Sequence, residues 1–194
     1  MKQYRSLAWM LCVFLGACAL QPKEPPRIMM QGFSIAAPKE KEPTWIVARQ
    51  GPDLTVIGKP GRFSGETFTM QATVTKLSAF ASADELLRHV ESAQRKELET
   101  KRYRLFKFEV KPQKIHEQTC ALSRVEVAER TTADGAGSPV NVMMESLTLV
   151  CPHPKEPTRG FSMVYSHRHF PEDVDPQFAD DAALLMGNLA FEPL

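Results

Sequence analysis

Two cysteines placed symmetrically about a turn constrain the fold of this chain more than any other feature. Segment 134–137 (DGAG) has the composition of a turn, and long runs with alternating apolar residues flank it at 114–130 and 140–150. In a hairpin centred on this turn, the numbers of facing residues add up to 271, as 120 and 151 do. Cys120 and Cys151 would then lie opposite each other at the open end of the hairpin, within reach of a disulfide.

One irregularity of the pattern works against that pairing. The apolar phase of 114–130, taken as one bent strand, shifts between Leu122 and Val125, which predicts a β-bulge. A bulge adds an unpaired residue to one strand, so the numbers of facing residues would no longer add up to 271 along the whole hairpin. Two buried free thiols are therefore the alternative to a disulfide.

The first residues of the chain have the layout of a secretory signal peptide. Lys2 and Arg5 precede a mostly apolar run at 7–15, and small residues lead up to Cys18. The run is shorter than the roughly 20 residues that a membrane-spanning helix needs. An uncleaved anchor and a buried core helix are the alternatives, but neither explains why the run stops at small residues and a cysteine.

Segment 15–18 (LGAC) resembles the lipobox of bacterial lipoproteins. The resemblance implies a signal peptide at 1–17, cleavage before Cys18, and lipid attachment to the sulfur and the freed amine of Cys18. More than one acyl chain would anchor the protein stably. By the same resemblance, Ala19 in place of an aspartate favours the outer membrane, facing the periplasm.

The chain without residues 1–17 has 177 of the 194 residues, which suits one domain and a tether. Its charge is close to neutral, with 22 basic residues against 23 acidic ones, so nothing electrostatic favours nucleic acid. We expect a proline-rich tether at 18–31 and a single domain at 32–194. Lipid on Cys18 is then the expected attachment to the membrane.

The use of cysteine agrees with export. Of the four cysteines, Cys12 would leave with the signal peptide and Cys18 would carry lipid. Cys120 and Cys151 remain as a pair in a compartment where disulfides persist. Their wide spacing differs from the C-x-x-C pairs of redox and zinc motifs. A structural disulfide is expected.

The remaining patterns predict an α+β fold, mainly antiparallel sheet packed by two principal helices. Ser82 and Glu85 form a capping box ahead of an amphipathic helix at 83–101. Asp175 and Pro176 are expected to start a second helix. Besides the hairpin strands, alternating runs predict strands at 32–36, 44–49, 54–59, 68–77, 105–110 and 160–169.

The motif at 33–38 (FSIAAP) followed by Trp45 resembles the entry of the PsbP-like α/β/α sandwich domains, which the DcrB-like bacterial lipoproteins combine with a lipobox. The resemblance covers residues 32–194. It implies a binding or assembly module, because members of this superfamily act mostly without catalysis. A cystatin-like or lipocalin-like sheet is the structural alternative.

Two histidines are the strongest candidates for a metal-binding or catalytic site. His167 and His169 would project from one face of a strand, with Glu172 and Asp173 just beyond. These residues could form a metal site, but two histidines without a second spaced pair of ligands are too few, so no metal and no cofactor are expected. The alternative is a solvent-facing strand edge whose histidines pair with nearby acids. His153 is expected in a turn.

The sequence contains no G-x-S-x-G, P-loop, H-E-x-x-H or dinucleotide-binding glycine motif. We therefore expect a lipid-anchored, non-catalytic envelope protein that binds or assembles another envelope component. A carrier of a small apolar ligand is the alternative, and an internal apolar cavity would favour it. A metal-dependent enzyme comes third, and it would need a cleft where His167 or His169 meets an acid of perturbed pKa.

Overall fold

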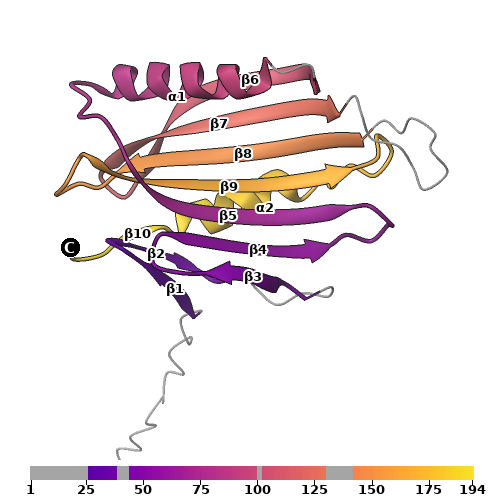
Figure 1. The fold of residues 1–194 in the computed structure, drawn as a ribbon, viewed down its shortest axis with the longest axis horizontal. Helices are drawn as coiled ribbons and strands as arrows, with labels where there is room; N and C mark the ends of the chain where they lie inside the picture. The colour runs from indigo at the N-terminus through magenta and orange to yellow at the C-terminus, as the bar shows by residue number, and fades with distance from the viewer. Residues whose placement is uncertain (1–25, 39–43, 100–101, 130–141) are drawn as a thin grey trace, which may run out of the picture.

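An antiparallel sheet with one helix on each face dominates the fold (Figure 1). The computed structural model describes residues 26–38, 44–99, 102–129 and 142–194. In these residues the large sheet has seven strands in the order β3-β4-β5-β9-β8-β7-β6. They are β3 (Ile46–Gln50), β4 (Leu54–Pro60), β5 (Thr67–Lys76), β6 (Tyr103–Ile115), β7 (Gln118–Glu129), β8 (Val142–Pro152) and β9 (Arg159–His169). The expected α+β fold with two principal helices is confirmed.

Both helices begin close to where the sequence predicts them. Helix α1 spans Ala83–Leu98, and the Ser82 hydroxyl accepts a hydrogen bond from the Glu85 backbone N–H at 3.3 Å, as expected for a capping box. Helix α2 spans Phe178–Gly187 and starts later than predicted. Asp175 caps the preceding turn instead, because its carboxylate accepts from the backbone N–H of Gln177 at 3.0 Å.

A small second sheet, in the order β1-β2-β10, closes one end of the core. Its strands are β1 (Arg27–Met30), β2 (Phe33–Ala36) and β10 (Ala190–Phe191). Residues 27–30 were predicted to belong to the tether 18–31, yet they pair with β2 and bury Ile28 and Met30. The fold therefore begins before residue 32. The signal segment 1–17 and Cys18 lie outside the described residues.

The two faces of the large sheet are covered unequally. Helix α2 and the small sheet cover the main apolar core, in which Phe161, Met163 and Tyr165 of β9 are almost fully buried. Helix α1 lies over β6 and β7 and buries a smaller cluster around Leu86 and Val90. Strands β5 and β9 are therefore less covered on the α1 face than on the α2 face.

The region predicted as one bent strand at 114–130 instead contains the end of β6, a tight turn and β7, which runs to Glu129. Strand β6 continues through Pro112 to Ile115, and a turn at His116, whose φ is 50°, leads into β7. The strand was predicted at 105–110, stopping before Pro112, but β6 is an edge strand, where a missing ladder donor is tolerated. The alternation of residues alone did not reveal the turn.

The predicted bulge between Leu122 and Val125 is also wrong. The β7–β8 ladder is continuous from Ala121↔Val150 to Glu129↔Val142, and the irregularity lies in β6, between Leu105 and Lys107. The apolar phase changes along β7 because both faces of this strand are covered, one by α1 and the other by the main core.

The predicted register and the disulfide are confirmed. Paired residues of β7 and β8 add up to 271 throughout the ladder, and Cys120 and Cys151 continue it by one pair. Their sulfur atoms are bonded, the Cα atoms are 4.4 Å apart, and both residues are fully buried. The bridge closes the open end of the hairpin.

We predict that the double variant Cys120→Ser/Cys151→Ser folds but melts at a lower temperature. The bridge spans 31 residues, and such a link stabilises a fold by roughly 2–4 kcal/mol by restricting the unfolded chain. Each kcal/mol corresponds to about 2–4 °C in a protein of this size. Thermal unfolding followed by circular dichroism tests the expectation. An unchanged melting temperature would contradict it.

Candidate functional site

A groove of about 900 Å³ runs between α1 and the less covered part of the sheet. Its floor consists of alternate residues of β5, β9 and β8, which point to the α1 face. The ladders place Thr73 opposite Ser162, and Ser146 opposite Ser166. The floor includes the apolar residues Met144, Val150 and Val164, and six of its side chains carry a hydroxyl group. They are Thr73, Thr75, Ser146, Thr148, Ser162 and Ser166.

The inner wall of the groove is more apolar than its floor. Val90, Ala93 and Leu98 of α1 line it, together with Val125 of β7. The polar side chains of His89, Gln94 and Glu97 interrupt this wall. The side-chain oxygen of Gln94 is buried and has no hydrogen-bond partner within the described part of the chain. A bound molecule with a hydrogen-bond donor could satisfy this oxygen.

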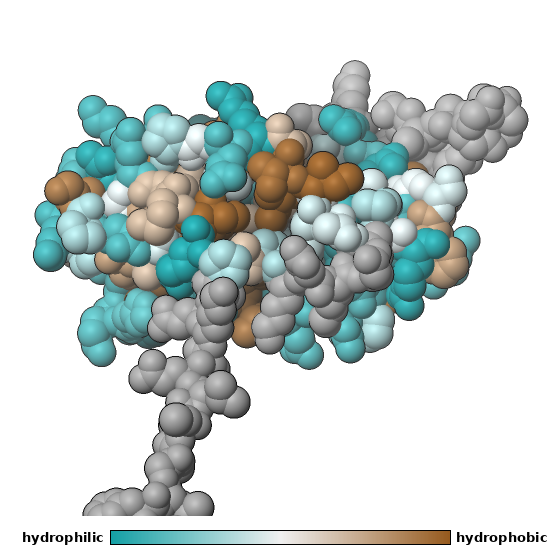
Figure 2. All heavy atoms as spheres, turned by 90° about the horizontal axis from the view of Figure 1, so that it is seen from below, coloured by the Kyte–Doolittle hydropathy of each residue, from teal (hydrophilic) through white to brown (hydrophobic). Residues whose placement is uncertain are grey.

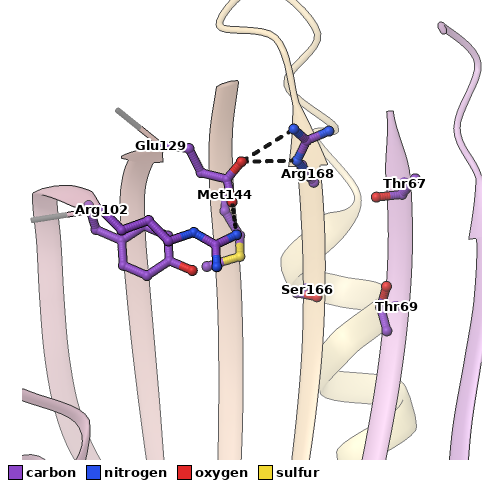
Figure 3. Close-up of a pocket in the computed structure, with 8 residues that line it drawn as sticks. Thr67, Thr69, Arg102, Glu129, Met144, Ser166 and Arg168 are labelled. Atoms are coloured by element: carbon purple, nitrogen blue, oxygen red, sulfur yellow. Dashed lines mark hydrogen bonds and ion pairs between the residues drawn. The ribbon is translucent and has the colours of Figure 1, made fainter. Parts of the chain in front are cut away.

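One end of the groove widens into a pocket of about 480 Å³ that contains two arginines (Figure 3). Arg102 and Arg168 approach the Glu129 carboxylate from two sides. The Nη2 atom of Arg102 lies 2.9 Å from Glu129 Oε1, while Nε and Nη2 of Arg168 lie 3.3 and 3.2 Å from Oε2. Ser166 lines both the pocket and the groove, so the two form one continuous surface.

The predicted histidine pair lies on one face of β9, but on the core face. His167 is 0% exposed and His169 is 5% exposed, so the expectation of a solvent-facing edge is wrong. Their rings stack on each other with centroids 4.4 Å apart. Neither Glu172 nor Asp173 is the acid partner; Nε2 of His167 lies 2.7 Å from Oε1 of Glu66.

Glu66 is a buried carboxylate that the sequence analysis missed. Its Oε2 accepts hydrogen bonds from the backbone N–H groups of Phe63, at 3.1 Å, and of Arg62. Burial acts to raise the pKa of Glu66, but the bonds from His167 and from these N–H groups outweigh it and lower the pKa. Burial lowers the pKa of His167, so the pair consists of a carboxylate and a neutral imidazole.

This buried pair does not form an open catalytic site. The His167 and Glu66 side chains are 0% and 1% exposed, so a dissolved substrate cannot reach them in this structure. Within the described ranges, no group of three or more His, Cys, Asp and Glu residues is arranged to hold a metal ion. His153, expected in a turn, is buried at the end of β8 and packs edge-on against Phe33.

A patch of exposed apolar residues lies away from the groove. Figure 2 shows hydrophobic residues gathered near the middle of the side that faces downwards in Figure 1, where β3 lies. On β3, Ile46 is 64% exposed and Val47 is 55% exposed. Because β3 and β6 are opposite edges of the sheet and α1 lies over β6 and β7, this patch and the groove are separate surfaces.

Comparisons with known proteins give distant structural similarity only. No protein-family model matches the chain, and no curated protein matches it significantly. The chain is similar to PsbP (CyanoP) from Synechocystis, the kind of domain that the sequence resemblance named. The identity is 12% and the TM-score 0.46, over 91% of this chain and 98% of that chain.

Two further solved structures are similar to this chain. One, from Bacteroides thetaiotaomicron, is 14% identical with a TM-score of 0.46 over 88% of this chain and 49% of that chain, so the present chain spans about half its length. The other is human StAR-related lipid transfer protein 5, 14% identical with a TM-score of 0.30 over 74% of this chain and 83% of that chain. At these scores, function has to be argued from the chain's own residues.

No helix among the described residues is long and apolar enough to span a membrane.

We predict that stability falls as the pH is lowered, because of Glu66 and His167. Below about pH 6.5 the unfolded chain protonates His167, whereas the folded chain, in which the pKa of His167 is lowered, resists protonation. Below about pH 4.5 the unfolded chain also protonates Glu66, whose pKa is lowered in the fold, so its contribution is lost as the pH falls through the folded value. Denaturant titrations at pH 7.5, 5.5 and 4 measure the fall.

The variant Glu66→Gln isolates the carboxylate. It should lower stability at pH 7.5 by about 1–3 kcal/mol, because a buried charged hydrogen bond is lost, and should reduce the further fall below pH 4.5. Glu117→Gln, at an exposed turn residue, is the matched control. A Glu66→Gln protein with the same acid sensitivity as the parent would exclude Glu66 as its source.

Proposed function

We propose that this protein is a lipid-anchored, non-catalytic component of the bacterial cell envelope that binds another envelope component in the groove beside α1. The observation that carries the proposal is the groove itself, about 900 Å³ in volume with a floor of hydroxyl groups. Binding sites are concave and combine apolar surface with a few polar groups that orient the ligand. The apolar wall and the hydroxyl floor meet that description.

The length of the groove favours an extended component. Its floor, with the arginine pocket, follows β9 from Ser162 to Arg168, and six steps of about 3.3 Å give a length of roughly 20 Å. Hydroxyl groups both donate and accept hydrogen bonds, so the floor can pair with a polar chain along this length. A carrier of a small apolar ligand, the alternative function, would need an enclosed apolar cavity instead.

The lipid anchor is proposed from the sequence. Segment 15–18 (LGAC), after a short apolar run, supports cleavage at residue 17 and acylation of Cys18. Strand β1 starts at Arg27, nine residues after Cys18, so an extended connection would hold the domain within about 30 Å of the bilayer. Ala19 supports the outer membrane, with the domain facing the periplasm.

The variant Cys18→Ser should remain unprocessed or be released as a soluble product, because the acylated sulfur is lost. Metabolic labelling with palmitate and fractionation of cell membranes measure the outcome. The Cys120→Ser/Cys151→Ser protein is the matched control, since it should keep both the label and the membrane attachment. A labelled, membrane-bound and normally processed Cys18→Ser protein would rule out the lipid anchor.

A photo-crosslinking amino acid at Thr73, on the floor of the groove, should capture the bound component in intact cells. The same amino acid at Ser92, which is exposed on α1 and does not line the groove, is the control. Membranes solubilised with the lipid anchor intact are then analysed by mass spectrometry. Products from Thr73 and not from Ser92 would support binding in the groove, whereas identical products from both positions would contradict it.

A further inference from the structure

We propose that the arginine pocket at the end of the groove binds an anionic group, a carboxylate or a phosphate, carried by the component that occupies the groove. The inference rests on the proposed function, and it adds the chemical class of the group that is recognised. The pocket is formed by Arg102, Glu129 and Arg168 together with hydroxyl-bearing side chains of β5 and β9.

The charges of the pocket do not cancel. Arg102 and Arg168 carry two positive charges, and Glu129 is the single acidic residue among the side chains that line the described pocket. The described side chains that line the pocket therefore carry a net charge of +1, which complements a monoanion. Thr67, Thr69 and Ser166 add hydroxyl donors to the same cavity. Hydroxyl and guanidinium donors together are the chemistry that carboxylate and phosphate oxygens require.

The arginine side chains are held in position before any ligand binds. Arg168 makes three contacts, because Nε and Nη2 meet Glu129 and Nη1 donates to the Gly65 carbonyl at 3.3 Å. Arg102 is held by Glu129 through Nη2. Each guanidinium has five N–H donors, so the contacts within the described chain use four of ten. Fixing the side chains in advance lowers the entropic cost of binding.

The pocket is continuous with the groove, so one ligand can occupy both. Met144, Tyr103 and Ser166 line both the pocket and the groove, so a chain lying along the hydroxyl floor can place its charged group beside the arginines, against their N–H groups that do not contact Glu129. Arg102 is 61% exposed and Arg168 is 32% exposed. Water competes for such partly exposed groups, so an isolated anion should bind weakly and the groove must supply further affinity.

The same residues could serve only to tie β7 to β9, and the experiment separates that role from binding. We would record amide NMR spectra of the isotope-labelled full chain in detergent while adding sodium acetate or inorganic phosphate at constant ionic strength. Saturable shifts centred on Thr67, Thr69 and Ser166 are expected. Arg102→Gln should weaken them by about three- to tenfold, since it removes a charged donor.

The choice of variants keeps the test decisive. Arg102 is largely exposed, so Arg102→Gln should fold even if Arg168→Gln does not. Arg49→Gln, at an exposed arginine of β3, removes the same charge far from the pocket and should leave the shifts unchanged. A response to acetate alone identifies a carboxylate as the group recognised, and a response to phosphate alone identifies a phosphate.

Two results would overturn the inference. One is the absence of saturable shifts with either anion, and the other is shifts of equal affinity in the parent and in Arg102→Gln. Either result would leave a structural ion pair as the role of the arginines. Crosslinking from Thr73 does not depend on the anion. Groove products without an anion response would therefore refute the arginine pocket while leaving the proposed function intact.

Discussion

The pairing of β5 with β9 is the contact on which the other features of this fold depend. These strands are far apart in the sequence, yet they form an unbroken ladder from Thr67↔Arg168 to Lys76↔Arg159. Side chains alternate between the two faces, so this register points Met70 and Tyr165 into the core and Thr73 and Ser162 into the groove. A slip of one residue would exchange the two faces, and with them both the core and the hydroxyl floor.

The same ladder fixes the loop at 61–66 from both faces of the sheet. On the core face, His167 hydrogen-bonds to Glu66, and on the groove face its neighbour Arg168 donates to the carbonyl of Gly65. Two glycines allow the loop to adopt this path. Gly65 has a φ of +88°, which favours glycine, and Gly61 lacks the Cβ atom that would lie 2.1 Å from the Glu66 carboxyl group. The buried Glu66–His167 pair and the end of the groove thus share one rigid support.

Local patterns in the sequence predicted local features well. The turn predicted at 134–137, which lies outside the described residues, and the two cysteines gave the register of β7 and β8, because a hairpin pairs residues by their distance from its centre. The capping box gave the start of α1, because the interacting residues Ser82 and Glu85 are only three positions apart in the sequence. The hairpin turn at His116 was missed, since an edge strand tolerates Pro112, which had been taken as its end. A strand of four residues in a proline-rich segment, β1, was missed as well.

The groove and the buried pair could not be derived from the sequence in the same way. Alternation in β5 and β9 indicates two faces, but which face a helix covers depends on how the whole chain packs. His167 and Glu66 are 101 positions apart. They meet only because Glu66 directly precedes β5 and the β5–β9 ladder brings that end of β5 beside His167. The sequence therefore identified His167 and His169 as candidates while misplacing them at a solvent-facing edge. Segment 1–18 and its lipid anchor stay a prediction from the sequence.

The composition of the groove floor explains how the sheet can leave one face partly uncovered. Threonine favours extended backbone as a β-branched residue, and its hydroxyl group can interact with water. A floor of Thr and Ser is therefore stable as a sheet without presenting the large apolar patch that promotes aggregation. Solvation alone would account for a uniform floor of this kind.

Two features of the groove are not explained by solvation of its floor. The inner wall contains the buried, unpartnered oxygen of Gln94, and the far end contains Arg102 and Arg168 on a shared carboxylate. Both are costly in a surface that has only to stay soluble, because a buried acceptor without a donor and fixed arginine side chains each oppose folding. A ligand that donates to Gln94 and places an anion beside the arginines would offset both costs.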